Sequence, residues 1–389
     1  MYYIDTAYGS IIKDGEELCG DYVEQVNLSD SKILVLSDGL GSGVKANILA
    51  TLTAKIASTM LKEGASLEET IDTIVHTLPV CSQRKLSYST FTIIKVYKDG
   101  QVYAAEFDNP SLFLHRKGKD VSLYKTKRII NGKTIFESSF QLDQDSVLVV
   151  VSDGVIHAGV GMLLNLGWEW ENVNEYLRGL SLEEKSALGV STKLLDVCQT
   201  LYDEKPGDDA TVVAVKIREQ ETINLFTGPP KNPDNDYAII KKILGMEGKV
   251  VVCGGTTANI VARALNCEMT VDLSTMTPEI PPVGAIANIE LVTEGVLTIS
   301  KAIQLIKGYV DPVYNSQIRD KLREKNGAAM LATLLIENCN KLNIWMGQAI
   351  NPAHQNANSP INFNFKAEQI KELARLMEDM GKEVCIHYI

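Results

Sequence analysis

Aspartates beside glycines recur in the N-terminal half of the sequence. Asp38 and Asp153 each occupy a Ser-Asp-Gly triplet directly after a run of apolar residues, Asp21 follows a glycine, and Asp208 and Asp209 follow another. A single triplet of this kind is usually only a turn, but carboxylates that converged from several turns would repel one another unless cations lay between them. Magnesium and manganese prefer carboxylate, carbonyl and water oxygens. The set therefore predicts a site for hard divalent cations.

Short strands and two helical zones must position these aspartates. Residues with helical spacing follow each Ser-Asp-Gly triplet, over 44–62 and 67–78 and again over 168–202, where loop residues interrupt them. The segments with the apolar pattern of strands are 32–38, 89–108, 111–125, 145–153 and 209–217. Several of these strands are joined by Asp-Gly or Lys-Gly turns. Hairpins interrupted by two helical blocks predict an α+β sandwich, with the sheets inside and the helices outside.

A polar segment separates this region from a second one. Residues 218–237 lie between two apolar regions and contain Gly228 and several prolines, as expected of a domain boundary. Beyond this segment, predicted helices and strands alternate, which favours an α/β fold with a partly parallel sheet. We therefore expect one domain over residues 1–218 and a smaller one over residues 219–389.

The composition describes a globular chain and excludes some classes of partner. Apolar residues make up 45% of the 389 residues, and 49 acidic residues outnumber 38 basic ones, for a formal charge of −11. Nucleic acids and anionic membranes bind clustered lysine and arginine, so neither is expected as the main partner. Seven cysteines lack the spacing of a zinc site or a disulfide framework. The N-terminus does not resemble a leader peptide, and no window approaches the roughly 18 apolar residues of a membrane span. We therefore expect a cytoplasmic protein with reduced cysteines.

The acidic turns resemble those of the metal-dependent protein phosphatases, the type 2C superfamily, and within it the bacterial stage II sporulation protein E branch. The resemblance depends on Cys-Gly-Asp ending at Asp21, SDGLGSGVKA from Ser37, SDGV from Ser152 and GDDAT from Gly207, and it covers about residues 1–217. Independent turns that agree in identity and in order make such a match specific. The resemblance implies an N-terminal αββα sandwich and the activity of a protein serine/threonine phosphatase.

The same resemblance implies a centre with two Mn²⁺ or Mg²⁺ ions. Asp38 would bridge the two ions, and the carbonyl of Gly39 would bind one of them. Asp21 would bind the same ion as Gly39, while Asp153 and Asp208 would hold the other. We predict Asp38 and Asp153 as the catalytic residues, because a water shared by two cations loses its proton near neutral pH and attacks phosphorus in line.

Three further residues near these turns have less certain roles by sequence. Asp209 is another candidate metal ligand, at a position that is often asparagine in the wider superfamily. Residues 13–21 lack the arginine that eukaryotic relatives use to bind phosphate, as do sporulation-type relatives. Lys45 is either a phosphate contact or a solvated lysine in a first helical turn. His157 is either a general acid for the leaving serine oxygen or a surface or packing histidine.

The second region contains one candidate ligand site. A predicted strand ends in Gly254-Gly255-Thr256-Thr257 before a helix, and exposed backbone N–H groups at a helix start can bind a small anion. The alternative is a tight turn in which Thr256 or Thr257 is the N-cap of the helix. Residues 347–364 form a long loop rich in asparagine and proline. The region resembles C-terminal extensions of some clostridial sporulation-type phosphatases, and we expect it to sense a ligand or a partner.

The predicted substrate is a phosphorylated regulatory protein, which the resemblance suggests is an anti-anti-sigma-like switch protein. Two alternatives remain open at this stage. One is a small-molecule phosphomonoesterase whose C-terminal domain contributes the substrate pocket. The other is a catalytically silent binding module, although no aspartate of the predicted site is missing from the sequence.

Overall fold

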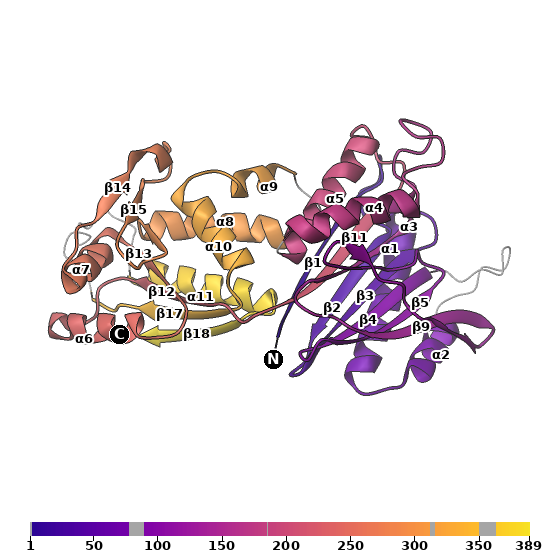
Figure 1. The fold of residues 1–389 in the computed structure, drawn as a ribbon, viewed down its shortest axis with the longest axis horizontal. Coiled ribbons are helices and arrows are strands. Elements are labelled where there is room, and N and C mark those ends of the chain that lie inside the picture. The colour runs from indigo at the N-terminus through magenta and orange to yellow at the C-terminus, as the bar shows by residue number, and fades with distance from the viewer. Residues whose placement is uncertain (1, 78–88, 185, 312–315, 350–362) are drawn as a thin grey trace. The chain divides into compact units, whose positions relative to one another are not determined.

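The computed structural model describes residues 2–77, 89–184, 186–311, 316–349 and 363–389. These residues form two units, one within Met1–Glu219 and the other over Gln220–Asp311 and Asn315–Ile389. In Figure 1 the first unit runs from indigo to magenta and the second from orange to yellow. Most of the predicted Asn- and Pro-rich loop, together with Leu78 and Cys81, lies outside the described residues. No helix in the described ranges is long and apolar enough to cross a membrane.

Two antiparallel sheets form the centre of the N-terminal unit. The strand orders are β1-β11-β10-β6-β7 and β2-β3-β4-β5-β9-β8. The first sheet consists of β1 (Tyr3–Ile11), β11 (Ala210–Arg218), β10 (Ser146–Val151), β6 (Phe113–Arg116) and β7 (Lys119–Asp120). The second consists of β2 (Asp21–Asn27), β3 (Ser31–Gly39), β4 (Ser89–Tyr97), β5 (Gln101–Phe107), β9 (Lys133–Gln141) and β8 (Thr126–Ile130).

Strand β3 is apolar on both faces because both faces are covered. Leu34 and Leu36 belong to a core that also contains residues of β10 and β11, so they point between the two sheets. Ile33 and Val35 belong to a second core, which contains apolar residues of two helices. Side chains alternate between the faces of a strand, so a continuous apolar run such as 33–36 is what a doubly covered strand requires.

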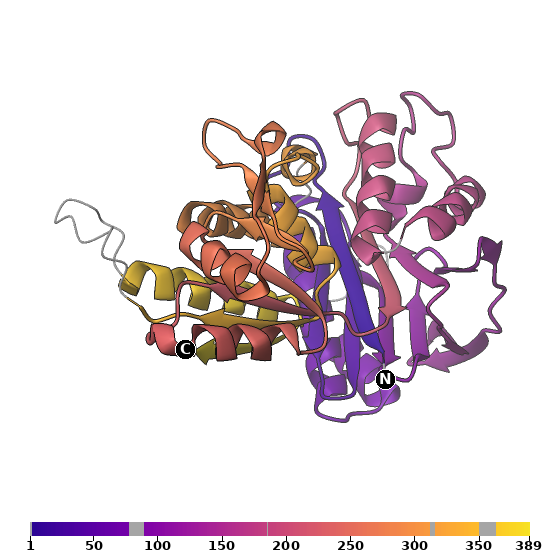
Figure 2. The ribbon, with the colours of Figure 1, turned by 60° about the vertical axis from the view of Figure 1, so that its left-hand side comes forward.

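Helices complete four layers around these sheets. The helices of the unit are α1 (Gly43–Lys62), α2 (Leu67–Thr77), α3 (Asp153–Ile156), α4 (Trp170–Glu183) and α5 (Ala187–Leu201). Helix α1 packs on β2, β3 and β4, whereas α5 packs on β1 and β11 of the other sheet. The layers are therefore helix, sheet, sheet and helix (Figures 1 and 2), which confirms the predicted αββα sandwich.

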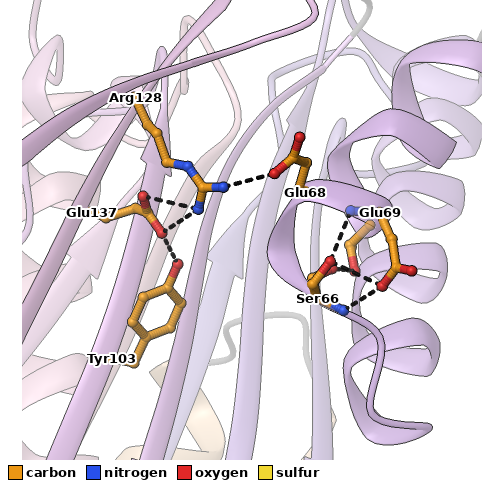
Figure 3. A network of polar contacts seen from close by, with 7 residues as sticks. Ser66, Glu68, Glu69, Tyr103, Arg128 and Glu137 are labelled. Atoms are coloured by element: carbon orange, nitrogen blue, oxygen red, sulfur yellow. Dashed lines mark hydrogen bonds and ion pairs between the residues drawn. The ribbon is translucent and has the colours of Figure 1, made fainter.

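The start of α2 is stabilised by its own residues and by the neighbouring hairpin (Figure 3). The Ser66 hydroxyl accepts a hydrogen bond from the Glu69 amide at 3.2 Å, and the Glu69 carboxylate accepts one from the Ser66 amide at 2.8 Å. This reciprocal pair is a capping box, and a cap contributes about 1 kcal/mol. Arg128 of β8 joins the helix to the sheet by contacting Glu68 at 2.8 Å and Glu137 of β9 at 3.5 Å.

The C-terminal unit contains one sheet with the order β14-β15-β16-β13-β12-β17-β18, as predicted partly parallel. Its strands are β12 (Thr222–Thr227), β13 (Lys249–Cys253), β14 (Thr270–Asp272), β15 (Val283–Ala285), β16 (Leu291–Thr293), β17 (Lys341–Met346) and β18 (Glu383–Tyr388). The helices are η1 (Pro233–Asn235), α6 (Asp236–Leu244), α7 (Gly255–Leu265), η2 (Leu273–Thr275), α8 (Val296–Val310), α9 (Ser316–Leu322), α10 (Gly327–Glu337) and α11 (Phe363–Asp379).

The two units divide between Glu219 and Gln220, within the predicted boundary segment 218–237, but the same segment also contains strand β12. This strand pairs in parallel with β13 on one side and with β17 on the other, and Ile223, Leu225 and Phe226 are buried. The sequence did not indicate this strand, because the apolar run of β12 is short and lies between polar residues, so the composition of the whole segment hides it. The pairing on both sides makes this stretch the first strand of the C-terminal sheet.

Candidate metal centre

Asp21 and Asp38 face each other across two neighbouring strands. They are directly opposite in the antiparallel register of β2 and β3. Close to them, the Gly39 amide donates a hydrogen bond to the Gly20 carbonyl at 3.1 Å. Asp21 is only 4% exposed, and its Oδ2 atom has no hydrogen-bond partner. Strand pairing thus brings two of the predicted carboxylates to one end of this sheet.

The glycine of each Ser-Asp-Gly triplet is required by close backbone packing. A Cβ atom on Gly39 would lie 2.1 Å from the carbonyl oxygen of Ala46 in α1. A Cβ atom on Gly154 would lie 2.0 Å from the carbonyl oxygen of Asp209. Neither contact is sterically possible. The two glycines therefore allow α1 and the turn at Asp209 to approach the ends of the acidic strands.

Asp153 and Asp208 come from the first sheet of this unit, at neighbouring ends of β10 and β11. Asp153 begins α3, and Asp208 precedes β11. The hydroxyl of Ser152 accepts a hydrogen bond from the Thr211 amide at 2.8 Å, which joins the two strand ends. The hydroxyl of Tyr202 donates to the Gly154 carbonyl at 2.7 Å and so fixes the first turn of α3 from the side of α5.

Asp209 binds backbone groups with both of its carboxylate oxygens. Its Oδ1 accepts a hydrogen bond from the Lys13 amide at 3.1 Å, and its Oδ2 accepts one from the Gly20 amide at 2.9 Å. Its own amide donates to Oδ1 of Asp208 at 3.0 Å. Asp209 is 4% exposed, so its carboxylate links the segment before β2 to the segment before β11.

The aspartates are close enough to alter one another's protonation. Burial, together with the charges of Asp153, Asp208 and Asp209, raises the pKa of Asp38 to about 7. Burial and the charge of Asp38 raise the pKa of Asp21, although the hydroxyls beside it oppose the shift. Burial and the charge of Asp208 likewise raise the pKa of Asp153. Such shifts follow when carboxylates lie close together, partly shielded from solvent, with too little positive charge nearby to compensate.

The donor set fits a hard divalent cation, although the side chains do not form a closed ligand shell. In the ranges that the structure describes, no group of three or more His, Cys, Asp or Glu side chains has the arrangement of a metal site. The available donors are nevertheless oxygens, and one of them, Oδ2 of Asp21, is buried without a partner. A cation beside Asp21 and Asp38 would satisfy this atom and offset the repulsion that raises the pKa of Asp38.

Two other residues singled out from the sequence, Lys45 and His157, are exposed to solvent. Lys45 is exposed in the first turn of α1. His157 is exposed at the C-terminal end of α3, and its charge lowers the pKa of Asp153. Sequence reasoning missed Lys13, whose Nζ lies 3.9 Å from Oδ1 of Asp208. Lys13 lies in the segment 13–21 that lacks arginine. Nothing in the sequence indicated its contact with Asp208, because the two residues are far apart along the chain.

The glycine-threonine segment of the C-terminal unit lies at the start of α7. Gly254, with a φ of 127°, is the N-cap residue, and no side chain caps the helix. The alternative with Thr256 or Thr257 as N-cap is therefore wrong. The Thr257 hydroxyl instead accepts a hydrogen bond from the Gly228 amide at 2.9 Å. It joins the ends of β12 and β13 because Thr257, in the first turn of α7, points back across the sheet edge.

Comparisons with known proteins point to one family. Residues 29–218 match the family model for stage II sporulation protein E (SpoIIE). No curated protein matches the sequence. Among solved structures, the chain is similar to the phosphatase domain of the cell fate determinant SpoIIE from Bacillus subtilis, with 22% identity, a TM-score of 0.43 and coverage of 56% of this chain and 93% of that chain.

Two further solved structures are similar over about the same part of the chain. The PP2C phosphatase domain of Bacillus subtilis SpoIIE with a fragment of its regulatory domain has 21% identity and a TM-score of 0.48, over 55% of this chain and 63% of that chain. RsbX in complex with magnesium has 17% identity and a TM-score of 0.41, over 56% of this chain and 100% of that chain.

The family match falls on the four-layer unit that carries the acidic strand ends. The matched residues 29–218 include β3 with Asp38, β10 with the turn to Asp153, and the turn that holds Asp208. Over these residues, the chain matches the stage II sporulation protein E family.

Proposed function

We propose that this protein is a cytoplasmic, metal-dependent phosphatase that removes phosphate from serine or threonine of a small bacterial regulatory protein. The observation that carries the proposal is the pairing of Asp21 with Asp38 at the end of β2 and β3, where burial and neighbouring carboxylates raise the pKa of Asp38 to about 7. The family match supports the class of reaction. An anti-anti-sigma-like switch protein is the proposed substrate.

Two Mn²⁺ or Mg²⁺ ions are the proposed cofactors. Asp38 would contribute to both ion sites, with Asp21 and the Gly39 carbonyl at one and Asp153 and Asp208 at the other. When bound, two such ions supply positive charge for phosphate oxygens and lower the pKa of water. RsbX, a similar structure, was solved with magnesium.

The residues of this chain hold that site in place through backbone contacts. Asp209 keeps the segments before β2 and β11 together by accepting from the Lys13 and Gly20 amides. Both of its oxygens are already used, so we assign Asp209 a positioning role in place of the predicted direct metal bond. Ser152 and Thr211 perform the same task for the strand ends next to Asp153.

Phosphatase assays with three substrates test the proposed function. We expect the full chain to hydrolyse p-nitrophenyl phosphate, a phosphoserine peptide and a phosphorylated switch protein with Mn²⁺, and to prefer the protein substrate by kcat/KM. EDTA should abolish all three activities. A preference for small phosphate esters would favour the phosphomonoesterase alternative, and the absence of turnover with any substrate would favour the silent binding module.

We propose further that the C-terminal unit regulates the phosphatase and contributes nothing to its active site. The predicted metal ligands all lie before β12, and residues 1–218 contain both sheets of the first unit. A shift of α1 would displace the acidic turn, because the Ala46 carbonyl of α1 packs directly against Gly39. A ligand-dependent preference for one position of α1 is sufficient for control.

A fragment of residues 1–218 should therefore fold and retain Mn²⁺-dependent hydrolysis of p-nitrophenyl phosphate. We expect its half-saturating Mn²⁺ concentration or its kcat to differ from those of the full chain, because the regulating unit is absent. Activity measured against Mn²⁺ concentration, with circular dichroism as the control for folding, checks this expectation. A folded fragment without activity at any Mn²⁺ concentration would show that the active site needs the C-terminal unit.

A further inference from the structure

The parallel strands of the C-terminal unit end together at one edge of its sheet. The order β16-β13-β12-β17-β18 places the first strand, β12, at the centre. The chain proceeds from β12 through β13 to β16 on one side, and then continues at β17 and β18 on the other. The direction therefore switches between β12 and β17. In open α/β sheets, ligands bind beyond the carboxyl ends of the strands at such a switch point.

Backbone segments approach one another closely at this switch point. A Cβ atom on Gly347, directly after β17, would lie 2.2 Å from the Gly228 carbonyl oxygen, directly after β12. The end of β16 also meets the residue before α7, because the Gly254 amide donates to the Thr293 carbonyl at 2.8 Å. Next to Gly254, Gly255 is exposed, and a Cβ atom there would meet nothing within 4 Å. The backbone at Gly255, in the first turn of α7, is therefore open to a ligand.

A lysine without a counter-ion lies at the same edge. Lys366 of α11 packs its amine against Gly228, where an added Cβ atom would lie 2.1 Å from Nζ. It makes no hydrogen bond or ion pair within the described residues. Its Nζ lies near the buried Cys253 thiol at the end of β13, and burial lowers the pKa of Lys366 to about 8. A half-buried amine with no ion pair among the described residues is a favourable site for an anion.

Two side chains, Glu294 and Gln369, each have a buried oxygen without a partner among the described residues. Glu294, which follows β16, has a buried Oε2 atom without a hydrogen-bond partner, and its charge reaches the same Cys253 thiol as Lys366 does. Gln369 is 6% exposed, and its Oε1 atom also lacks a partner. Gln369 follows Lys366 by three positions, so both lie on one face of α11. Carboxylate and amide oxygens of this kind accept hydrogen bonds from hydroxyl or amino groups.

We propose that this edge binds a small phosphorylated metabolite that also carries hydroxyl groups, of the class of sugar phosphates and nucleotides. The phosphate would lie between the start of α7 and the amine of Lys366, where backbone N–H groups and a cation both favour it. The hydroxyl groups would donate hydrogen bonds to Glu294 and Gln369. A ligand with both features satisfies the lysine and the unpaired oxygens together, whereas inorganic phosphate satisfies only the lysine.

Binding to the full-length protein in EDTA tests this site apart from the metal centre. We expect ribose 5-phosphate or AMP to bind saturably in isothermal titration calorimetry and to raise the Tm, and inorganic phosphate to bind more weakly. Lys366→Gln should weaken binding at least about tenfold, because it removes a hydrogen bond from a charged donor. Glu294→Gln should weaken binding of the hydroxylated probes but leave inorganic phosphate unaffected.

Matched variants keep the test decisive. Lys371→Gln changes an exposed lysine of the same helix and should leave binding unchanged. Lys366→Gln should not lower the Tm of the ligand-free protein, since it removes an unpaired, half-buried charge, and Lys366→Met serves as a second variant if the first is poorly folded. Lack of binding by all three probes, or equal binding by the wild type and both Lys366 variants, would overturn the proposal. Phosphatase activity of the wild type with Mn²⁺ is measured separately from this binding. The proposed ligand site and the proposed phosphatase function can therefore fail independently.

Discussion

Replacement of Asp38 by alanine should reduce Mn²⁺-dependent phosphatase activity to background while the protein stays folded. Asp38 is the carboxylate proposed to serve both ions, and it stands opposite Asp21 in the β2–β3 pairing. Its loss therefore removes a ligand from each ion site at once, whereas the strand pairing around it depends on backbone groups. Initial rates with p-nitrophenyl phosphate over a wide range of Mn²⁺ concentrations, with circular dichroism as the folding control, measure the effect. Substantial Mn²⁺-dependent turnover by the variant would refute the proposed centre.

A second variant, Asp38→Asn, should respond differently to pH from the wild type in the absence of metal. The pKa of Asp38 is about 7 in the folded protein, compared with about 4 for an unfolded aspartate. The contribution of its proton to stability is therefore fully present below about pH 4 and is lost as the pH rises through 7. Urea unfolding in EDTA should show a smaller loss of stability from pH 4 to pH 7 for Asp38→Asn than for the wild type. An equal loss in both proteins would contradict the shared acidic environment.

Asp209→Ala should mainly lower the stability of the protein, whereas Asp208→Ala should mainly weaken metal binding. Asp209→Ala leaves the amides of Lys13 and Gly20 without their acceptor, which should lower the free energy of unfolding by roughly 2–4 kcal/mol. The side chain of Asp208 is 46% exposed, and its ion pair within the described residues is the 3.9 Å contact with Lys13. Its removal should therefore change stability by about 0.5 kcal/mol or less. Asp208→Ala should instead raise the Mn²⁺ concentration required for activity.

Urea unfolding in EDTA and Mn²⁺ titrations of activity separate these two roles. We expect Asp209→Ala to be the unstable variant and Asp208→Ala to be the stable variant with weak metal binding. Asp209→Asn is the matched control, because it keeps one acceptor oxygen and should fall between the wild type and Asp209→Ala in stability. If Asp209→Ala were as stable as the wild type and shifted the Mn²⁺ requirement, Asp209 would be a direct ligand.

Local pattern predicted the elements of the N-terminal unit that have a strong signal. The apolar run 33–36 is the doubly covered part of β3, and the predicted helix over 44–62 is α1, which begins at Gly43. Strands β1, β2, β8 and β9 were not predicted. Several of their residues are polar and half-buried, so their strand character depends on hydrogen bonds to neighbours far along the chain.

The sequence by itself determined which chemical groups stand at the acidic turns and in which order, because identity and spacing within a turn are local properties. Tertiary structure decided how these groups are used. The opposition of Asp21 and Asp38 comes from strand register, and the engagement of both Asp209 oxygens comes from the approach of Lys13 and Gly20.

The C-terminal unit shows the same division. The sequence indicated the glycines at the start of α7, but it did not indicate that β12 is a central strand. Nor did it indicate the position of Lys366, which reaches Gly228 from a helix much later in the chain. Contacts of this kind join residues with no local relation, so no spacing in the sequence encodes them. They exist only once the strands have paired and the helices have packed against the sheet.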